Sequence, residues 1–509
     1  TEFKAGQKII FEVKPSISFI KGRESYLTID LENTSSNRLC GHPFNTIGVA
    51  GLIQRLDIFS LQNGQLLESL VDLNKWSNIE NQYLNSNNNQ LVIKEGCVEP
   101  LTSFINGCNP ATKVLSKTAE GLTHGWAGVS RLSTINTDGN TNFMPHKFIL
   151  PLRSGIFNHF GVDEKLTPNL LFGGMRLEFT CADNEKVLSR VPSLAGDGTT
   201  YDCDTPANGV DCGDTSGAET TITTTKDFSS MQNSGFSIGQ RVSFTSDNAT
   251  TGTGGAKTHN KHITSLDITA NKLVIGFTGQ VTMADNVRVS FLASDQTLSY
   301  TAKNVELKLL EVIPPQNILK QVIKESQFDF ISYETFMGNL PTSSLTHQED
   351  IPSVATRAKA LFTHYIDTTS ENDAFHPNYY TGVSPLDLNL NSVQYFINNK
   401  LYPLRHYDPS HFQDKIVSLN ELNKSMKAIG KDVMRFGNAG GGGINEYNFT
   451  YLTSRELARG QQFVYALKDS ESQLRLGFST ARTNNIKLTT FCFSVRSIMI
   501  SNDSLTLVL

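Results

Sequence analysis

Apolar and polar residues alternate in many short segments of this chain, and this period of two is the feature that most limits its fold. In "SYLTIDLEN" (25–33) Leu27, Ile29 and Leu31 alternate with polar neighbours, and "MRLEFT" (175–180) repeats the pattern. Side chains point alternately to the two faces of a strand, so each segment predicts a half-buried strand. Alternation of this kind is typical of antiparallel sheets with one solvated face.

These segments form two series, separated by Pro314-Pro315, where strand pairing must stop. We place a domain boundary here, which predicts a first domain over 1–315 and a second over 316–509. Strands in short regular units, without a helix after each one, favour two tandem antiparallel sandwiches over a parallel sheet. A chain of 509 residues is long enough to bury a core in each.

Two helices are predicted among the strands. The first lies in "QLLESLVDLNKWSNIENQYL" (65–84), where Leu66, Leu70, Leu73 and Trp76 have helical spacing. The second is "SLNELNKSMKAIG" (418–430), in which Ser418 and Glu421 have capping-box spacing and Gly430 can end the helix. Its apolar stripe is Leu419, Leu422, Met426 and Ile429.

The composition changes abruptly in the middle of the chain. Residues 195–259 are dominated by Gly, Ser, Thr, Asn and Asp, and are too poor in apolar side chains to build a core alone. Strand signals resume in "KLVIGFTGQVTM" (272–283). We interpret the region as a polar surface-loop insertion of the first domain, over about 185–298.

The segment "SVQYFINNKLYPLRHYD" (392–408) predicts a hairpin. Val393, Tyr395 and Ile397 share one face, and Asn398-Asn399 form the corner. Bulky residues such as Phe396 also occupy the other face. One sheet face cannot hide all of this apolar surface, so we expect part of it to pack against the neighbouring sandwich or a neighbouring chain.

Charge and hydropathy exclude some classes of function. The formal net charge of -5 does not indicate the extensive basic surface that a protein needs if its main role is to bind nucleic acid. No apolar run approaches the roughly 18 residues of a membrane span. The first residues, "TEFKAGQKIIFEV", lack the order of a signal peptide. We therefore expect no specific nucleic acid, no transmembrane segment and no secretory signal.

No metal site can be assigned from the residues. The best candidate is "DCDTPANGVDCGD" (202–214), but Pro206 and Ala207 stand where an EF-hand needs a ligand and a glycine. A polar turn is the preferred interpretation, and a calcium site is the alternative. His406 and His411, five apart around a proline, fit neither a helical pair nor a known metal loop. The candidate carboxylates are Asp202, Asp204, Asp211 and Asp214.

The seven cysteines are scattered, without a CxxC pair, so neither a zinc site nor a dense disulfide framework is indicated. Reduced thiols are expected, and a Cys203–Cys212 pair in oxidising surroundings is the alternative. Catalytic motifs are also lacking. "AGGGGIN" (439–445) has no phosphate-loop lysine, no GxSxG elbow occurs, and no acid pair is singled out for glycoside hydrolysis. We predict no enzyme activity, no cofactor, and no catalytic, cofactor-binding or metal-ligating residues.

Several short segments of the sequence resemble those of one viral protein family. In the first half they are 51–74 ("GLIQRLDIFSLQNGQLLESLVDLN"), 148–157 ("FILPLRSGIF"), 169–179 ("NLLFGGMRLEF") and 300–314 ("YTAKNVELKLLEVIP"). In the second half they are the hairpin and 463–493 ("FVYALKDSESQLRLGFSTARTNNIKLTTFCF"). Together they resemble the double jelly-roll major capsid proteins of the adenovirus hexon lineage, most closely those of virophages, Polinton-like viruses and adintoviruses.

This resemblance implies an all-β fold of two tandem antiparallel eight-stranded jelly-roll sandwiches, with short helices and long loop insertions. It implies a major capsid protein that homotrimerises into pseudo-hexagonal capsomers, which tile an icosahedral viral shell. Its partners would be neighbouring capsomers and minor capsid or penton proteins, and its location the virion, assembled inside the host cell. The insertion would belong to an outward-facing tower. The alternative is a carbohydrate-binding or attachment β-sandwich protein.

Overall fold

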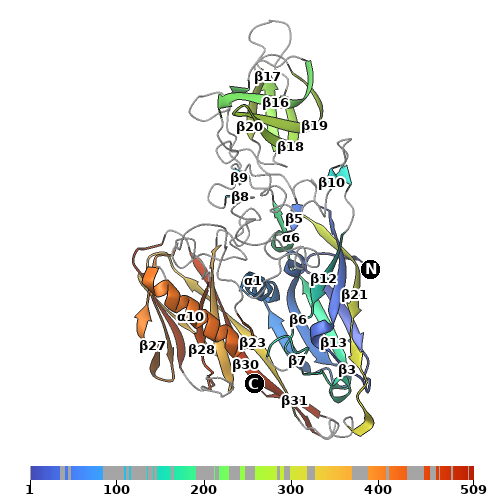
Figure 1. Ribbon diagram of the computed structural model, residues 1–509, viewed down its shortest axis with the longest axis vertical. Helices are drawn as coiled ribbons and strands as arrows, with labels where there is room; N and C mark the ends of the chain where they lie inside the picture. The colour runs from blue at the N-terminus through green and yellow to red at the C-terminus, as the bar shows by residue number, and fades with distance from the viewer. Residues whose placement is uncertain are drawn as a thin grey trace.

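The computed structural model describes the strands and helices of both halves of the chain (Figure 1). The described residues are 2–34, 41–43, 48–83, 146–161, 165–190, 298–317, 327–368, 388–408, 412–432, 452–458, 466–468, 471–482, 485–501 and 504–508. Shorter described pieces are 108–109, 114–115, 134–135, 141–142, 211–212, 217–227, 241–246, 258–283 and 287–291.

The first half forms a sandwich of two four-stranded antiparallel sheets. One has the order β1 (Glu2–Phe3), β21 (Tyr300–Lys308), β4 (Tyr26–Asn33) and β12 (His146–Pro151). The other has the order β2 (Lys8–Val13), β13 (Met175–Cys181), β6 (Ile53–Ser60) and β7 (Leu66–Val71). The chain crosses between the sheets at each step except the hairpin from β6 to β7. This is the strand order of a jelly roll.

The second half repeats that order strand for strand. One sheet runs β23 (Gln327–Leu340), β30 (Ile486–Ser501), β25 (Ala358–Asp367) and β28 (Leu452–Glu456). The other runs β24 (Thr346–Asp350), β29 (Ser472–Phe478), β26 (Leu390–Ile397) and β27 (Lys400–Tyr407). A last strand, β31 (Ser504–Val508), pairs with the end of β30. The predicted fold of two tandem eight-stranded jelly rolls is confirmed.

The alternation in the sequence explains these strands. Leu27, Ile29 and Leu31 of β4 are fully buried. In β13, Met175 and Phe179 face the core, and Arg176 and Glu178 form an ion pair on the opposite face. Each sheet therefore buries the face that the period of two predicted.

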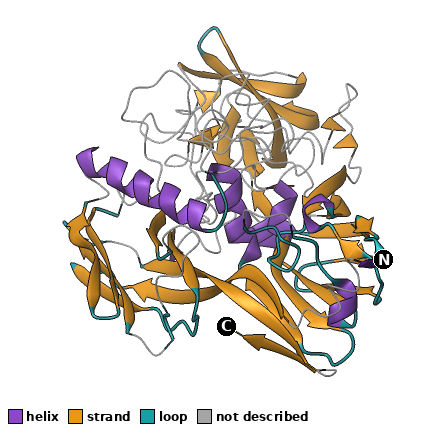
Figure 2. Cartoon of the chain, turned by 60° about the horizontal axis from the view of Figure 1, so that its bottom comes forward, coloured by secondary structure: helices purple, strands orange, loops and turns teal. Residues whose placement is uncertain are grey.

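A helix follows the hairpin of each sandwich: α1 (Leu73–Tyr83) after β7 and α10 (Phe412–Ala428) after β27. Figure 2 shows both along one side of the pair of sandwiches. Both predicted starts were wrong. Leu66 and Leu70 belong to strand β7, and α10 already begins at Phe412, so Ser418 is not its cap.

The end of α10 agrees with the prediction. Gly430 has φ 75°, its amide donates to the carbonyl of Lys427, and the amide of Lys431 donates to that of Met426. This is a Schellman motif, which a glycine completes without strain. Among the described helices, none is long and apolar enough to cross a membrane.

The insertion contains a sheet where composition predicted a polar excursion. Six antiparallel strands lie beyond one end of the sandwiches (Figure 1), and Ile222, Leu273 and Ile275 are buried in them. Threonine is a good strand former, so the Thr-rich segments build strands despite their low apolar content. The strand order is β15 (Asp211–Cys212), β20 (Val287–Phe291), β17 (Arg241–Ser246), β18 (Thr258–Thr269), β19 (Lys272–Met283) and β16 (Gly217–Asp227).

The remaining elements are short. They are β3 (Phe19–Ile20) with β22 (Glu311–Val312), β5 (Gly41–Pro43) with β14 (Leu188–Arg190), β8 (Cys108–Asn109) with β9 (Val114–Leu115), β10 (Thr134–Ile135) with β11 (Thr141–Asn142), α6 (Asn184–Val187), and the 3-10 turns η1 (Gly22–Glu24), η2 (Gly48–Leu52) and η3 (Asn169–Phe172).

The predicted hairpin is β26 and β27, and its corner is a tight two-residue turn. Asn398 and Asn399 have φ 50° and 59°, and Ile397 pairs with Lys400, as in a type I′ turn. Val393, Tyr395 and Ile397 are buried in the core of the second sandwich.

The outer face of the hairpin is covered from within the same sandwich. The guanidinium of Arg475 on β29 lies 4.2 Å from the ring centre of Phe396 and covers this ring from within the sandwich. Tyr402 pairs with Tyr395 and packs on the core side instead, where the guanidinium of Arg455 lies 5.2 Å from its ring centre. Leu404 remains 89% exposed.

The turn provides a test of the fold. Asn399→Val places a β-branched residue in the left-handed region and is expected to lower the free energy of unfolding by about 1–2 kcal/mol. Asn399→Gly, the matched control, should keep wild-type stability because glycine adopts positive φ freely. Urea unfolding measures both. Equal stability of the two variants would contradict this turn geometry.

Candidate functional site: the junction between the two sandwiches

The sheet of β23, β30, β25 and β28 buries both of its faces. On one face Leu361, Tyr365 and Leu488 belong to the core of the second sandwich. On the other face Phe362 and Phe491 belong to a core that includes the first sandwich. The first sandwich therefore packs on the outer face of this sheet, and the two jelly rolls share one apolar core.

Trp76 of α1 lies at the centre of this shared core and is fully buried. The ring of Phe493 lies 4.5 Å from it between centroids, that of Phe362 5.2 Å and that of Phe491 5.5 Å, all three from the second sandwich. Most of these rings meet edge to face or tilted, which is the favourable arrangement of aromatic pairs. A tryptophan from one half thus fills a pocket of rings from the other.

Glu68 of β7 joins the two sandwiches by hydrogen bonds. It is fully buried and accepts from the hydroxyl of Ser332 at 2.6 Å, in the second sandwich. It also accepts from the Ser154 hydroxyl and from the amides of Gly155 and Ile156 at 2.9 and 3.2 Å, in the first. This carboxylate is fully satisfied, so its burial carries no unpaired polar group.

Gly155 allows the two backbones to touch. A Cβ at this position would collide with the carbonyl oxygen of Ile331 on β23. Next to this contact, the hydroxyl of Thr335 on β23 donates to the carbonyl of Val71 on β7 at 3.1 Å. The edges of the two sheets therefore meet directly, and only glycine fits at the closest point.

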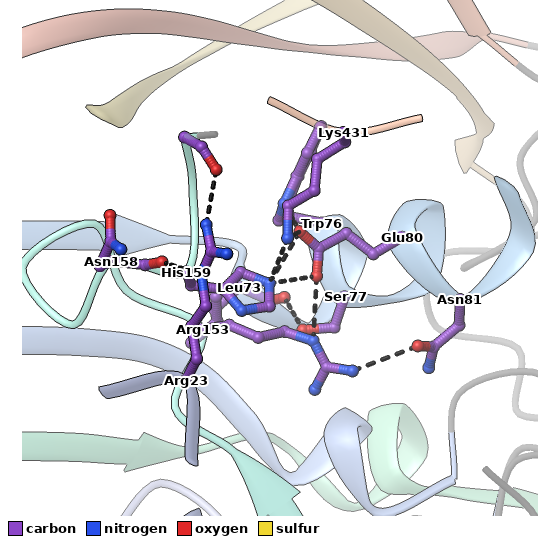
Figure 3. Close-up of polar contacts among 11 residues, drawn as sticks. Arg23, Leu73, Trp76, Ser77, Glu80, Asn81, Arg153, Asn158, His159 and Lys431 are labelled. Atoms are coloured by element: carbon purple, nitrogen blue, oxygen red, sulfur yellow. Dashed lines mark hydrogen bonds and ion pairs between the residues drawn. The ribbon is translucent and has the colours of Figure 1, made fainter. Parts of the chain in front are cut away.

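A second buried carboxylate, Glu80 of α1, gathers positive groups from both halves (Figure 3). It accepts from Trp76 Nε1 at 3.0 Å, from His159 Nε2 at 2.7 Å and from Arg153 Nε at 3.2 Å. Lys431 Nζ, which follows α10 in the second sandwich, lies 3.9 Å away. We call Glu80, Arg153, His159 and Lys431 the junction charge cluster.

Burial and neighbouring charges act against each other in this cluster. Burial alone would raise the pKa of Glu80, but the hydrogen bond from His159 and the attraction of Lys431 and Arg153 hold it below its usual value. Burial lowers the pKa of His159 to about 4, against the pull of Glu80. Burial also lowers the pKa of Lys431. At neutral pH the cluster holds one carboxylate, two cations and a neutral imidazole.

Helix α1 is buried although its sequence is mostly polar. Asn74, Lys75 and Asn78 are as inaccessible as Trp76. Lys75 Nζ lies 3.2 Å from Asp72 and 3.5 Å from the hydroxyl of Thr489 on β30. Charged groups survive burial only when paired, and here the partners come from both sandwiches.

The sequence-derived metal candidates do not converge on this junction. His406 lies exposed on β27, and Asp211 and Cys212 form the short strand β15. His411, residues 439–445, Asp202, Asp204, Asp214 and Cys203 lie outside the described residues. Within the described part of the chain, no three His, Cys, Asp or Glu side chains gather as metal ligands would.

Two cysteines are described as thiols, Cys181 in β13 and Cys492 in β30. Burial raises the pKa of each thiol to about 12. A thiol with so high a pKa is a poor nucleophile, so both act as small core residues.

The junction was not predicted from the sequence, although one signal in it pointed there. Phe491, Cys492 and Phe493 are consecutive apolar residues, as are Ala360, Leu361 and Phe362. A strand buried on both faces has no polar alternate positions. These two runs therefore mark the sheet that is covered twice.

Comparisons with known proteins gave matches among solved structures only. No protein-family model and no curated protein matches the chain. The structure of PBCV-1 VP54, fitted into a reconstruction of the virophage Sputnik, is similar at 10% identity and a TM-score of 0.45, over 100% of this chain and 96% of that one. The Faustovirus major capsid protein is similar at 7% identity and a TM-score of 0.48, over 98% and 88%. The mavirus major capsid protein is similar at 9% identity and a TM-score of 0.35, over 100% and 90%.

Removing the central carboxylate tests the junction. Glu80→Gln removes the buried carboxylate that His159, Arg153 and Lys431 face, and is expected to cost about 3–5 kcal/mol of unfolding free energy. Glu2→Gln is the control, because its ion pair with Lys303 is on the surface and should contribute nothing measurable. Urea unfolding measures both. A Glu80→Gln variant as stable as the control would contradict this role of the cluster.

Proposed function

We propose that this chain is a major capsid protein, a structural component of the virion rather than an enzyme. The observation that carries the proposal is the repeated jelly-roll order in two sandwiches that are fixed to each other by one buried core. Such a molecule is a stiff block with two similar lobes. The function of such a molecule lies in its shape rather than in a chemical reaction.

A block with two similar lobes suits a tiled shell. Three copies around a threefold axis place six similar sandwiches in a ring, and closed cyclic symmetry is the common solution for homo-oligomers. We infer that the chain forms a homotrimer, that the trimer is a pseudo-hexagonal capsomer, and that capsomers tile an icosahedral shell. The lobes must keep their mutual angle for such a ring to close, and Trp76, Glu68 and Gly155 serve that purpose.

The outer flank of the second sandwich offers a contact surface. Leu404 on β27 is 89% exposed, and Ile416 on the adjoining α10 is 69% exposed. Val417 is exposed beside it. We propose that this flank, defined by Leu404, Ile416 and Val417, packs against a neighbouring copy in the trimer, since strongly exposed apolar side chains on adjoining elements can mark a contact site.

The remaining expectations belong to the same proposal. The domains would be 1–315, with an insertion over about 185–298, and 316–509. Partners other than further copies would be minor capsid or penton proteins. The place of action would be the virion, after assembly inside the host cell.

A carbohydrate-binding or attachment protein is the second candidate. Jelly rolls also build lectins, and the separate sheet of β15–β20 is a module that the two sandwiches do not need for their own cores. This function would require neither a trimer nor a shell.

The oligomeric state distinguishes the two candidates. Light scattering after size-exclusion chromatography should give a mass of three times 56.1 kDa. Electron microscopy of the same sample should show threefold particles. A stable monomer at high concentration would contradict the capsid proposal, and saturable sugar binding by that monomer would favour the second candidate.

Charged substitutions test the proposed flank. Leu404→Asp with Ile416→Asp should convert the trimer to monomers, because two carboxylates would have to be buried at the contact. Stability of the monomer should not change, since both side chains are exposed. The control is Ile313→Asp, 72% exposed after β22, away from the flank. Loss of the trimer in the control, or its survival in the double variant, would place the contact elsewhere.

A further inference from the structure

The junction charge cluster brings three basic side chains to the carboxylate of Glu80. Arg153 and Lys431 are cations, and His159 can become a third. The cationic Arg23 stands close by, donating to the carbonyls of Asn158 and Gly161 (Figure 3). Only Glu80 among these groups is negative. A proton on His159 would therefore add a third cation beside Glu80.

The other acidic groups of the junction are already engaged. Asp72 is paired with Lys75, and Glu68 accepts four hydrogen bonds from hydroxyls and amides. Burial, and then the negative charges of Asp72 and Glu68, raise the pKa of the Tyr333 hydroxyl. The ring of Tyr333 neighbours Trp76. A proton added at His159 would thus have Glu80 as its counter-charge among the described groups, and Glu80 already faces Arg153 and Lys431.

Protonation would place two cations in contact. His159 Nε2 lies 3.4 Å from Lys431 Nζ, and the two residues belong to different sandwiches. We propose that the junction charge cluster is an acid-sensitive latch, in which protonation of His159 repels Lys431 and releases the end of α10 from the first sandwich. This inference does not depend on the capsid proposal.

The contact between Glu80 and Lys431, across the junction, is the one that would break. Glu80 holds His159 at 2.7 Å and Arg153 at 3.2 Å within the first sandwich, but Lys431 only at 3.9 Å. The backbone link beside it is one hydrogen bond, from the amide of Gly161 to the carbonyl of Ile429, at 2.9 Å. Repulsion is therefore relieved most easily by moving Lys431 and the end of α10 away.

The pH range follows from His159. Its pKa falls from an ordinary 6.5 to about 4 in the folded protein, so folding favours the neutral form. The closed junction is at full stability above pH 6.5 and loses stability as pH falls from 6.5 towards about 4. Glu80 stays ionised through this range because its pKa lies below its usual value.

Tryptophan fluorescence tests the latch. The chain has two Trp, and in a Trp126→Phe background Trp76 reports on the junction alone. Its emission is expected to shift to the red, reversibly, as pH falls from 6.5 towards 4. His159→Gln keeps a donor for Glu80 but cannot gain a proton, so the shift should disappear. His347→Gln, which alters a histidine–glutamate pair inside the second sandwich, should leave the shift unchanged.

Hydrogen exchange separates opening of the latch from unfolding. At about pH 4.5 the Gly161 amide should exchange at least about tenfold faster than its rate at neutral pH predicts once the pH dependence of intrinsic amide exchange is taken into account. The amide of Tyr395 in β26 should stay protected. If His159→Gln does not fold, Lys431→Met provides the test. It removes the cation that His159 would repel, and it should also abolish the fluorescence shift.

Two results would overturn the proposal. One is an acid shift of Trp76 emission that persists in His159→Gln or in Lys431→Met. The other is loss of protection at Gly161 and Tyr395 together, which would mean that acid unfolds the whole second sandwich rather than opening the junction. Trimer formation at neutral pH is measured separately and does not decide either result.

Discussion

The burial of one sheet on both faces is the constraint on which this molecule depends. The sheet of β23, β30, β25 and β28 presents Phe362, Phe491 and Phe493 on the face that its own sandwich does not cover. Exposed to water, these rings would form a large apolar patch of the kind that associates nonspecifically. The first sandwich and Trp76 cover them.

The polar groups of the junction make this contact specific. Apolar packing alone permits sliding, whereas Glu68 and Gly155 each fix one point of the second sandwich against the first. Buried carboxylates are expensive unless every partner is in place, so a displaced arrangement is penalised strongly. The aromatic core supplies the attraction, and the carboxylates select one orientation.

Much of the fold, but little of the junction, could be predicted from the sequence. The period of two located strands correctly, and Asn398-Asn399 located a turn. The start of α1 was misplaced because Leu66 and Leu70 are four apart, a spacing that fits one face of a helix as well as one face of a regular strand. In β7 a register shift leaves Leu66 exposed while Leu70 is buried. Only tertiary pairing of β7 with β6 decides between the two.

The junction escaped prediction for a physical reason. The polar residues of α1 look like the solvated face of an amphipathic helix, because nothing local indicates that Glu80 will meet Arg153, His159 and Lys431. These partners are far apart in sequence, and the compensation of their charges exists only after both sandwiches have folded. Composition alone also failed to predict the sheet in the insertion, since threonine-rich strands need few apolar residues to pair.

The attachment of the insertion has a consequence for how the chain folds. The hydroxyl of Tyr300 at the start of β21 donates to the carbonyl of Ala182 just after β13, at 2.6 Å, so the two ends of the inserted segment are held together. The entropic cost of bringing these ends together grows only slowly with the length of the segment between them, by about 0.6 kcal/mol for each doubling. The first jelly roll can therefore accept inserted segments of very different length at a small cost in stability.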